Sequence, residues 1–80
     1  MTVSTHTQEY TKFTEILKQT RLDMGLTQQD VADRLDKPQS YVAKLENSER
    51  RIDVVEFIHL AIAIGADPKD LFDRVFTNIS

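Results

Sequence analysis

The amino-acid sequence predicts an all-α domain of five short helices, and three observations lead to this prediction. Apolar residues recur every three or four positions over most of the chain, which is the period of a helix with one buried face. No segment shows the apolar–polar alternation of a half-buried strand. Only two glycines and two prolines occur in 80 residues, and each stands where a helix would end or begin. A chain of this length forms one domain with a small core, burying about 60–65% of the surface that its unfolded form exposes.

The chain begins with a polar segment and a first amphipathic helix. Residues 1–7 are small and polar, so we expect a flexible N-terminal arm. The first helix is predicted from about residue 8 to 24. Its inward face contains Tyr10, Phe13, Ile16, Leu17, Arg21 and Met24. Gly25 follows, and glycine readily adopts the left-handed backbone conformation that ends many helices.

A second and a third helix follow, separated by a proline. Thr27 is a typical N-cap and Asp30 stands three residues later, close to a capping box, so a helix is predicted over 27–35. Its inward residues are Val31, Ala32 and Leu35. Pro38 disfavours helix in the residue before it but suits a first turn, so the next helix is predicted over 38–47.

The last two helices are predicted over 54–64 and 68–78. Residues 48–53 form a charged loop that ends in Asp53, a plausible N-cap, and Asp67 with Pro68 opens the fifth helix in the same way. The fifth helix has a broad apolar face made of Leu71, Phe72, Val75, Phe76 and Ile79. We expect Leu71 and Phe72 to close the core. The other three either fold back on that core or form the interface of a homodimer.

Composition excludes several classes of function. The net charge is −3, and because Lys and Arg balance Asp and Glu over residues 1–52, the acidic excess lies in residues 53–80. There is no cysteine, the two histidines are far apart in the sequence, and no glycine-rich phosphate loop or nucleophile with a base partner is visible. We therefore expect no metal, no cofactor and no enzymatic activity. The chain has no long apolar run and no leader sequence, which favours a cytoplasmic protein and no membrane span.

The third helix has one polar face of unusual composition. With about 100° between successive residues, an arc of about 140° collects small and polar side chains, and the apolar residues lie opposite. The residues of this arc are Gln39, Ser40, Ala43, Lys44 and Asn47. Amide, hydroxyl, methyl and ammonium groups suit the edges of DNA bases in the major groove. A merely solvated helix face is the alternative reading.

The preceding helix and its turn favour the DNA-binding interpretation of this face. Counting Gln28 as the first position, Val31, Leu35, Val42 and Leu45 give apolar residues at positions 4, 8, 15 and 18. Ala32 provides a small residue at position 5, where two helices joined by a tight turn would cross closely. This is the arrangement of a helix-turn-helix.

These segments resemble the phage-repressor/Cro-like, or XRE-type, family of helix-turn-helix regulators. The matching residues are RLDMGLTQQDVADRL at 21–35, QSYVAKLENSERR at 39–51 and VVEFIHLAIAIGADPKDLF at 54–72. The resemblance implies a compact five-helix, lambda-repressor-like domain that binds double-stranded operator DNA, usually as a two-fold dimer. Its third helix would lie in the major groove of a short inverted repeat.

The resemblance also implies roles for individual residues. Gln39, Ser40 and Lys44 match the base-reading positions. Gln28 and Asn47 match positions that bind backbone phosphates, and Arg50 and Arg51 are close enough to assist. Arg21 and Glu46 match a partly buried salt bridge between the first and third helices, which would turn Glu46 away from the DNA. Independently of the resemblance, Tyr41 stands at the boundary of the apolar face, where it either only packs its ring inward or also offers its hydroxyl to a phosphate.

Two residues depart from the family pattern, since Asp36 and Ser48 stand where glycine is common.

We expect a sequence-specific transcriptional regulator, of the repressor or controller type. The alternative is an antitoxin-like or other protein-interaction module that uses the fifth helix to bind a protein partner.

Overall fold

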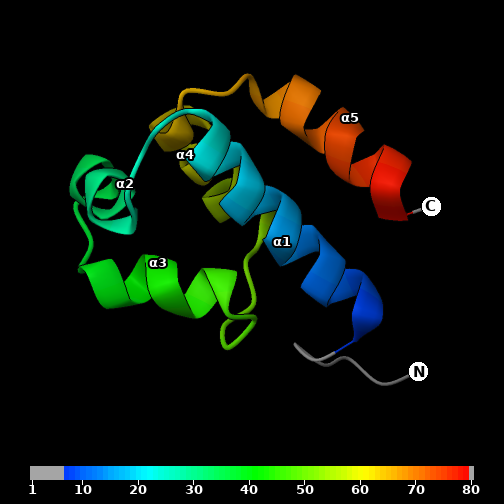
Figure 1. Ribbon diagram of the computed structural model, residues 1–80, viewed down its shortest axis with the longest axis horizontal. Coiled ribbons are helices and arrows are strands. Elements are labelled where there is room, and N and C mark those ends of the chain that lie inside the picture. The colour runs from blue at the N-terminus through cyan, green and yellow to red at the C-terminus, as the bar shows by residue number, and fades with distance from the viewer. Residues whose placement is uncertain (1–6, 80) are drawn as a thin grey trace.

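The computed structural model describes residues 7–79 and has the predicted all-α fold (Figure 1). Its helices are α1 (Gln8–Asp23), α2 (Gln28–Leu35), α3 (Gln39–Glu46), α4 (Val54–Ile64) and α5 (Pro68–Ile79). No strand occurs in the part of the chain that the structure describes. Within that part, no helix is long and apolar enough to cross a membrane. The observed ends lie within one residue of the predicted ends.

The helix ends explain why each element begins where it does. Thr7, which we had assigned to the arm, is instead the N-cap of α1, because its side chain accepts a hydrogen bond from the Tyr10 amide over 3.1 Å. The rest of the predicted arm lies outside the described residues. α2 and α4 each begin with a complete capping box, formed by Thr27 with Asp30 and by Asp53 with Glu56. Such reciprocal bonds satisfy two backbone amides that the helix itself leaves unpaired.

One apolar core lies between the helices. α2 packs against α3 and α4, α1 packs against α3 and α5, and α4 also packs against α5. In Figure 1, α1 runs between α5 on one side and the α2–α3 pair on the other. The most buried large side chains are those of Leu17, Leu45, Ile64, Val31 and Val42. Ala32 is fully buried, as expected where two helices approach closely.

The inward face of α5 differs from the prediction. Phe72, which we expected in the core, is 56% exposed. Val75, for which both the core and a dimer interface were open, is only 8% exposed and belongs to the core. The inward stripe follows Leu71, Val75 and Ile79 at intervals of four residues, and Ile79 packs partly buried against the core. Phe72 and Phe76 each follow a residue of this stripe by one position, about 100° around the helix. Their rings stack on each other, with centroids 6.3 Å apart.

Met24 also differs from the prediction, because it is exposed and not part of the inward face of α1. α1 ends at Asp23, and Met24 is its C-cap residue. Its amide still donates to the carbonyl of Thr20 as in a helix, but its side chain extends to Gly65 at the edge of the core and stays half-exposed. Gly25 then takes a positive φ of 73°, as predicted for the residue that ends the helix.

Candidate nucleic-acid interface

The turn between α2 and α3 is tight and built on a left-handed residue. Asp36 has φ 56° and ψ 45°, a conformation that Asp and Asn tolerate better than most residues. The amide of the next residue, Lys37, donates to the carbonyl of Ala32 over 3.0 Å and closes the end of α2. Pro38 then opens α3. Asp36 therefore provides the left-handed backbone conformation for which glycine is common at this position.

The polar arc of α3 is open to solvent. Gln39, Ser40, Lys44 and Asn47 are all exposed, and Ala43 is half-buried. On the opposite side of the helix, Val42 and Leu45 are each 1% exposed and anchor α3 in the core. The four polar side chains therefore occupy one uncovered face, carried by a helix that is fixed from behind.

A buried ion pair joins α1 to the end of α3. Arg21 binds Glu46 through two bonds, Nε to Oε2 over 2.6 Å and Nη2 to Oε1 over 2.9 Å. Both side chains are only 6% exposed. Arg21 also donates to the carbonyl of Leu26 over 2.7 Å, which ties the loop before α2 to the same guanidinium. Glu46 thus turns inward and its charge is neutralised within the domain. No buried side-chain nitrogen or oxygen among residues 7–79 lacks a partner.

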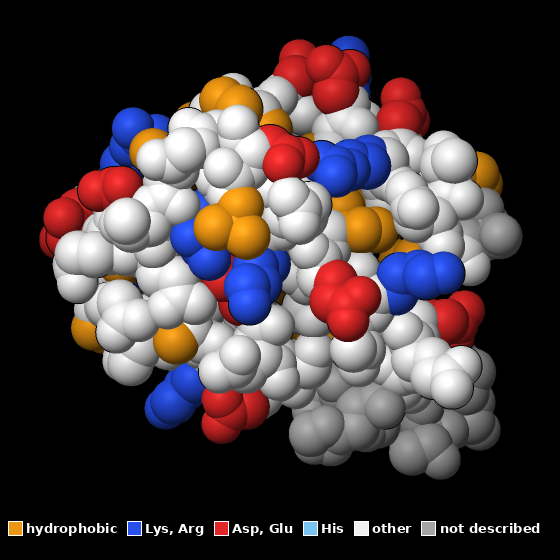
Figure 2. All heavy atoms as spheres, in the orientation of Figure 1, with side chains coloured by type: hydrophobic (Ala, Val, Ile, Leu, Met, Phe, Trp, Pro, Cys, Tyr) orange, Lys and Arg blue, Asp and Glu red, His pale blue; other side chains and the backbone are white. Residues whose placement is uncertain are grey.

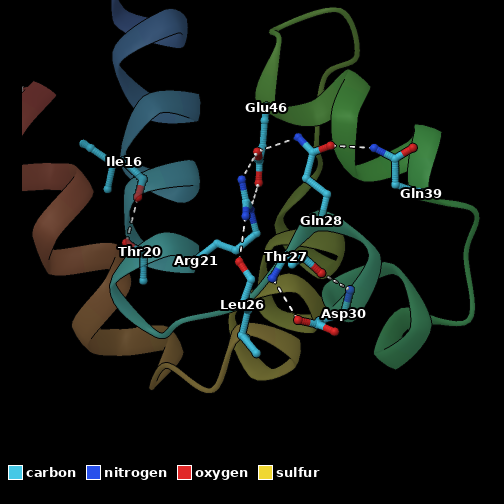
Figure 3. A network of polar contacts seen from close by, with 9 residues as sticks. All are labelled: Ile16, Thr20, Arg21, Leu26, Thr27, Gln28, Asp30, Gln39 and Glu46. Carbon is cyan, nitrogen blue, oxygen red and sulfur yellow. Dashed lines mark hydrogen bonds and ion pairs between the residues drawn. The ribbon is translucent and has the colours of Figure 1, made fainter.

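Two hydrogen bonds made by the side-chain amide of Gln28 connect this ion pair to Gln39, the first residue of α3 (Figure 3). Gln28 donates its Nε2 to Glu46 Oε1 over 2.9 Å, and its Oε1 accepts from Gln39 Nε2 over 2.6 Å. A carboxylate can only accept, so Glu46 determines which end of the Gln28 amide faces Gln39. Gln39 then keeps its Oε1 and one N–H for an outside partner. An acceptor beside a donor is the pattern that pairs with the N6 and N7 groups of adenine.

A second polar cluster flanks α3 on the side of α4. Tyr41 donates its hydroxyl to Glu56 Oε2 over 2.9 Å, and Arg50 Nη2 lies 2.9 Å from the same oxygen. The Arg50 guanidinium stacks 4.8 Å from the centre of the Tyr41 ring, and Lys37 Nζ lies 5.4 Å from it. Arg50, together with the Asp53 backbone amide, lowers the pKa of Glu56 to about 2. Burial, followed by the bond to Glu56, raises the pKa of Tyr41.

The loop that carries the two arginines is fixed to α1. Tyr10 donates its hydroxyl to the carbonyl of Arg50 over 2.9 Å, and the Arg51 guanidinium lies 4.5 Å from the centre of the Tyr10 ring. Burial raises the pKa of Tyr10. Ser48 has a left-handed φ of 60°, and its buried hydroxyl bonds to that of Thr14 over 2.7 Å. Arg50 and Arg51 are therefore held close to the C-terminal end of α3.

The structure brings most of the predicted site residues together and separates the rest. Those on α3, Gln28 at the start of α2 and the loop arginines lie around one helix. The predicted interface residues Val75, Phe76 and Ile79 belong to α5, which lies across α1 from α3 in Figure 1. Sequence reasoning did not identify Glu56 as part of the site. Its only signal was its position three residues after Asp53, which indicates a capping box but not its bonds to Tyr41 and Arg50.

The surface in Figure 2 mixes basic and acidic side chains closely, without one continuous basic patch on the face shown. This pattern agrees with the balance of charges over the first two thirds of the sequence.

Comparisons with known proteins agree with this geometry. The helix-turn-helix family profile matches residues 17–71. An XRE-family-like protein from Pseudomonas syringae pv. tomato str. DC3000 is 39% identical over 90% of this chain and 88% of its own, with a TM-score of 0.82. The restriction-modification controller protein C.AhdI from Aeromonas hydrophila is 33% identical over 76% of this chain and 92% of its own, with a TM-score of 0.68.

A further controller protein shares the fold. The restriction-modification controller protein C.Esp1396I is 19% identical over 92% of this chain and 97% of its own, with a TM-score of 0.83. No significant match to the chain was found among curated proteins. The chain belongs to the XRE-type helix-turn-helix family of DNA-binding transcriptional regulators.

Proposed function

We propose that this regulator recognises a short inverted-repeat operator by placing α3 in the major groove. Gln39, Ser40 and Lys44 would contact base edges. The observation that carries this proposal is the exposed polar face of α3 together with the chain of bonds that orients Gln39 from behind. A preformed amide orientation reduces what must be ordered when the DNA binds.

Backbone contacts would set the register of the protein on the duplex. Gln28 and Asn47 lie at the start of α2 and at the C-cap of α3, where the phosphates on the two sides of the groove would pass. Arg50 and Arg51 follow the C-terminal end of α3 and would add contacts there, and the Tyr41 hydroxyl would add one from the first turn of α3. Because these contacts include few charges, we expect weak binding to unrelated sequences and a modest dependence on salt.

We infer that the protein binds as a homodimer through the exposed apolar surface between α4 and α5. This surface contains Val54, Ile58, Phe72 and Phe76, and it includes a hollow of about 400 Å³. Lys69 and Asp73 also line the hollow. In a two-fold pair the same surface meets itself, so the Lys69 ammonium of one copy could face the Asp73 carboxylate of the other. A dimer would set two α3 helices about 34 Å apart, one helical turn of DNA.

The chemistry of the site is binding without a covalent step, and we propose a cytoplasmic regulator with no enzymatic activity. The same apolar surface supports a second candidate, a module that binds a different protein in an antitoxin-like manner. The two candidates differ in what occupies the surface. A stoichiometric partner that co-purifies with the chain would favour the second.

Selection of bound sequences from a random duplex pool, at about physiological salt, tests the proposal directly. We expect one enriched motif made of two inverted half-sites with centres about one helical turn apart. Enrichment of a motif without two-fold symmetry would contradict the dimeric arrangement. Absence of any enrichment would contradict sequence-specific reading by α3.

A further inference from the structure

In the free protein, the Tyr41 hydroxyl already uses its only hydrogen in a hydrogen bond to Glu56. A hydroxyl donates one hydrogen bond, and Glu56 is a carboxylate that can only accept, so the 2.9 Å bond between them uses the Tyr41 hydrogen. A phosphate oxygen is also only an acceptor. Tyr41 therefore cannot donate to a DNA phosphate while it is bonded to Glu56.

The same carboxylate also neutralises Arg50. Arg50 Nη2 and Tyr41 Oη both contact Glu56 Oε2, and a second Arg50 nitrogen donates to the carbonyl of Arg51 over 3.1 Å. The Arg50 side chain is 41% exposed and that of Glu56 is 26% exposed, so solvent reaches this ion pair and Arg50 can exchange Glu56 for another partner. We call Tyr41, Arg50 and Glu56 the flank cluster. The other charged groups near it are Lys37, which lies over the same ring, and Asp53 at the start of α4.

The flank cluster lies where a phosphate backbone would run. The major groove is about 12 Å wide, so a helix inserted in it has one DNA strand along each flank. Tyr41 is on α3 itself, about 200° around the helix from Gln39, and Arg50 follows closely after the end of α3. The carboxylate of Glu56 thus holds, from the protein side, two donors that face the expected path of one strand.

We propose that Glu56 is an internal competitor of DNA phosphate, which holds Tyr41 and Arg50 in the free protein and so sets the affinity for duplex DNA. This inference rests on the proposed placement of α3 in the major groove. Phosphate must displace Glu56 before either donor can bind it, and the displaced carboxylate then lies beside the backbone. Glu56 therefore lowers the affinity for every duplex, whatever its sequence.

The test compares Glu56→Gln with the unmodified 80-residue chain, on the selected operator and on a duplex of random sequence. Glutamine keeps the capping box of α4, and its neutral amide has no charge to hold Arg50. Release of Arg50 to one phosphate in each half-site should steepen the slope of log K against log salt by about 1.8 for the dimer and tighten its binding by roughly sixtyfold at about 0.1 M salt. Thermal unfolding of each variant confirms that the fold is retained.

Two further variants separate release of Arg50 from simple loss of a nearby negative charge. Glu49→Gln is the matched control. Glu49 lies in the loop that carries Arg50, but its carboxylate accepts a hydrogen bond from Asn47 and not from Arg50 or Tyr41. It should tighten binding by much less than Glu56→Gln. With Arg50→Gln already present, Glu56→Gln releases only the uncharged Tyr41 hydroxyl, so the salt slope should no longer steepen and most of the gain in affinity should be lost.

Three results would overturn the proposal. Glu56→Gln would bind no more tightly than Glu49→Gln, or its salt slope would be unchanged, or it would bind more weakly than the unmodified chain, as a residue that positions Arg50 for phosphate would predict. Any of these leaves the proposed function intact, provided that the unmodified chain binds its operator. If the unmodified chain binds neither duplex, the proposed function fails and this inference fails with it.

Discussion

The side-chain amide of Gln28 donates to the buried carboxylate of Glu46 over 2.9 Å, and this bond joins the start of α2 to the end of α3, the helix that we propose reads DNA. Arg21 fixes Glu46 from α1, and Gln28 presents its remaining oxygen to Gln39. Each bond determines the direction of the next, because a guanidinium only donates and a carboxylate only accepts. The orientation of the first side chain of α3 therefore depends on an ion pair made by α1.

Removal of Gln28 should impair the same base position that Gln39 reads. Gln39→Ala should cost about 1–3 kcal/mol on the operator and relax the preference at one base. Gln28→Ala should weaken discrimination at that base by leaving the Gln39 amide free to rotate. Because the two residues act in one chain of bonds, the double variant should lose less than the sum of the single variants. Titration of matched and single-mismatch operators measures all four free energies.

Asp70→Asn is the control for this cycle, since Asp70 is exposed at the start of α5, which is across α1 from α3, and does not line the hollow between α4 and α5. It should leave base preference unchanged. Equal effects of Gln39→Ala and Asp70→Asn would show that α3 is not the reading helix.

The buried ion pair should matter for stability and orientation in separable ways. Glu46→Ala leaves Arg21 as an unpaired buried charge, which should cost about 3–5 kcal/mol of unfolding free energy. The double replacement Arg21→Met with Glu46→Leu removes both charges and should recover most of that loss. It cannot restore the acceptor for Gln28, so DNA discrimination at the Gln39 base should stay reduced. Urea unfolding and operator titration on the same samples measure the two effects. Recovery of both together would contradict the orienting role of Glu46.

The loop after α3 offers a test of the left-handed residue Ser48. Thr14 donates its hydroxyl to the carbonyl of Thr11 over 3.0 Å, so the 2.7 Å bond between the two hydroxyls must use the proton of Ser48. Ser48→Ala loses this bond and keeps the strained φ, which should cost about 1 kcal/mol. Ser48→Gly loses the bond but relieves a strain of about 1–2 kcal/mol, so its stability should be close to that of the unmodified chain. Urea unfolding that ranks the glycine variant below the alanine variant would contradict this account.

The sequence was sufficient for the parts of the fold that depend on local chemistry. Thr27 and Asp30, and the spacing of Val31, Val42 and Leu45, predicted where the helices begin and which faces are buried. Phe72 was assigned wrongly because an apolar face as broad as that of α5 fits more than one inward register, and only packing against α1 and α4 decides among them.

The missed contacts of the site have a different cause. Glu56 meets Tyr41 and Arg50 only because the loop between α3 and α4 brings the first turn of α4 against α3. Such a contact depends on the path of the chain through space, and no sequence period records it. The bond between Gln28 and Gln39 likewise requires the particular angle that the left-handed Asp36 gives to the turn.

The corrected packing of α5 separates folding from self-association. Val75 is buried, so Val75→Ala should lower the unfolding free energy by about 1–3 kcal/mol. Phe72 is exposed beside the hollow between α4 and α5, so Phe72→Lys should weaken the dimer and leave the stability of one copy nearly unchanged. Ile62→Lys is the control, because Ile62 is 61% exposed on α4 but does not line that hollow. Sedimentation equilibrium of the three variants distinguishes the two effects, and equal association of the Phe72 and Ile62 variants would exclude this surface.

The flank cluster should also give stability a specific dependence on pH. The pKa of Glu56 is about 2 in the folded protein against an ordinary value of 4.5, so the folded state binds fewer protons than the unfolded state between these values. Its contribution to stability is therefore complete above pH 4.5 and is lost as the pH falls towards 2. Asp30, whose pKa is lowered mainly by its bond to the Thr27 amide, acts in the same direction. Glu56→Gln removes only the first contribution, so the stability advantage of the unmodified chain over this variant should be constant above pH 4.5 and shrink below it. Urea unfolding over this pH range measures the difference, and parallel curves for the two proteins would show that the bonds of Glu56 to Arg50 and Tyr41 do not stabilise the fold.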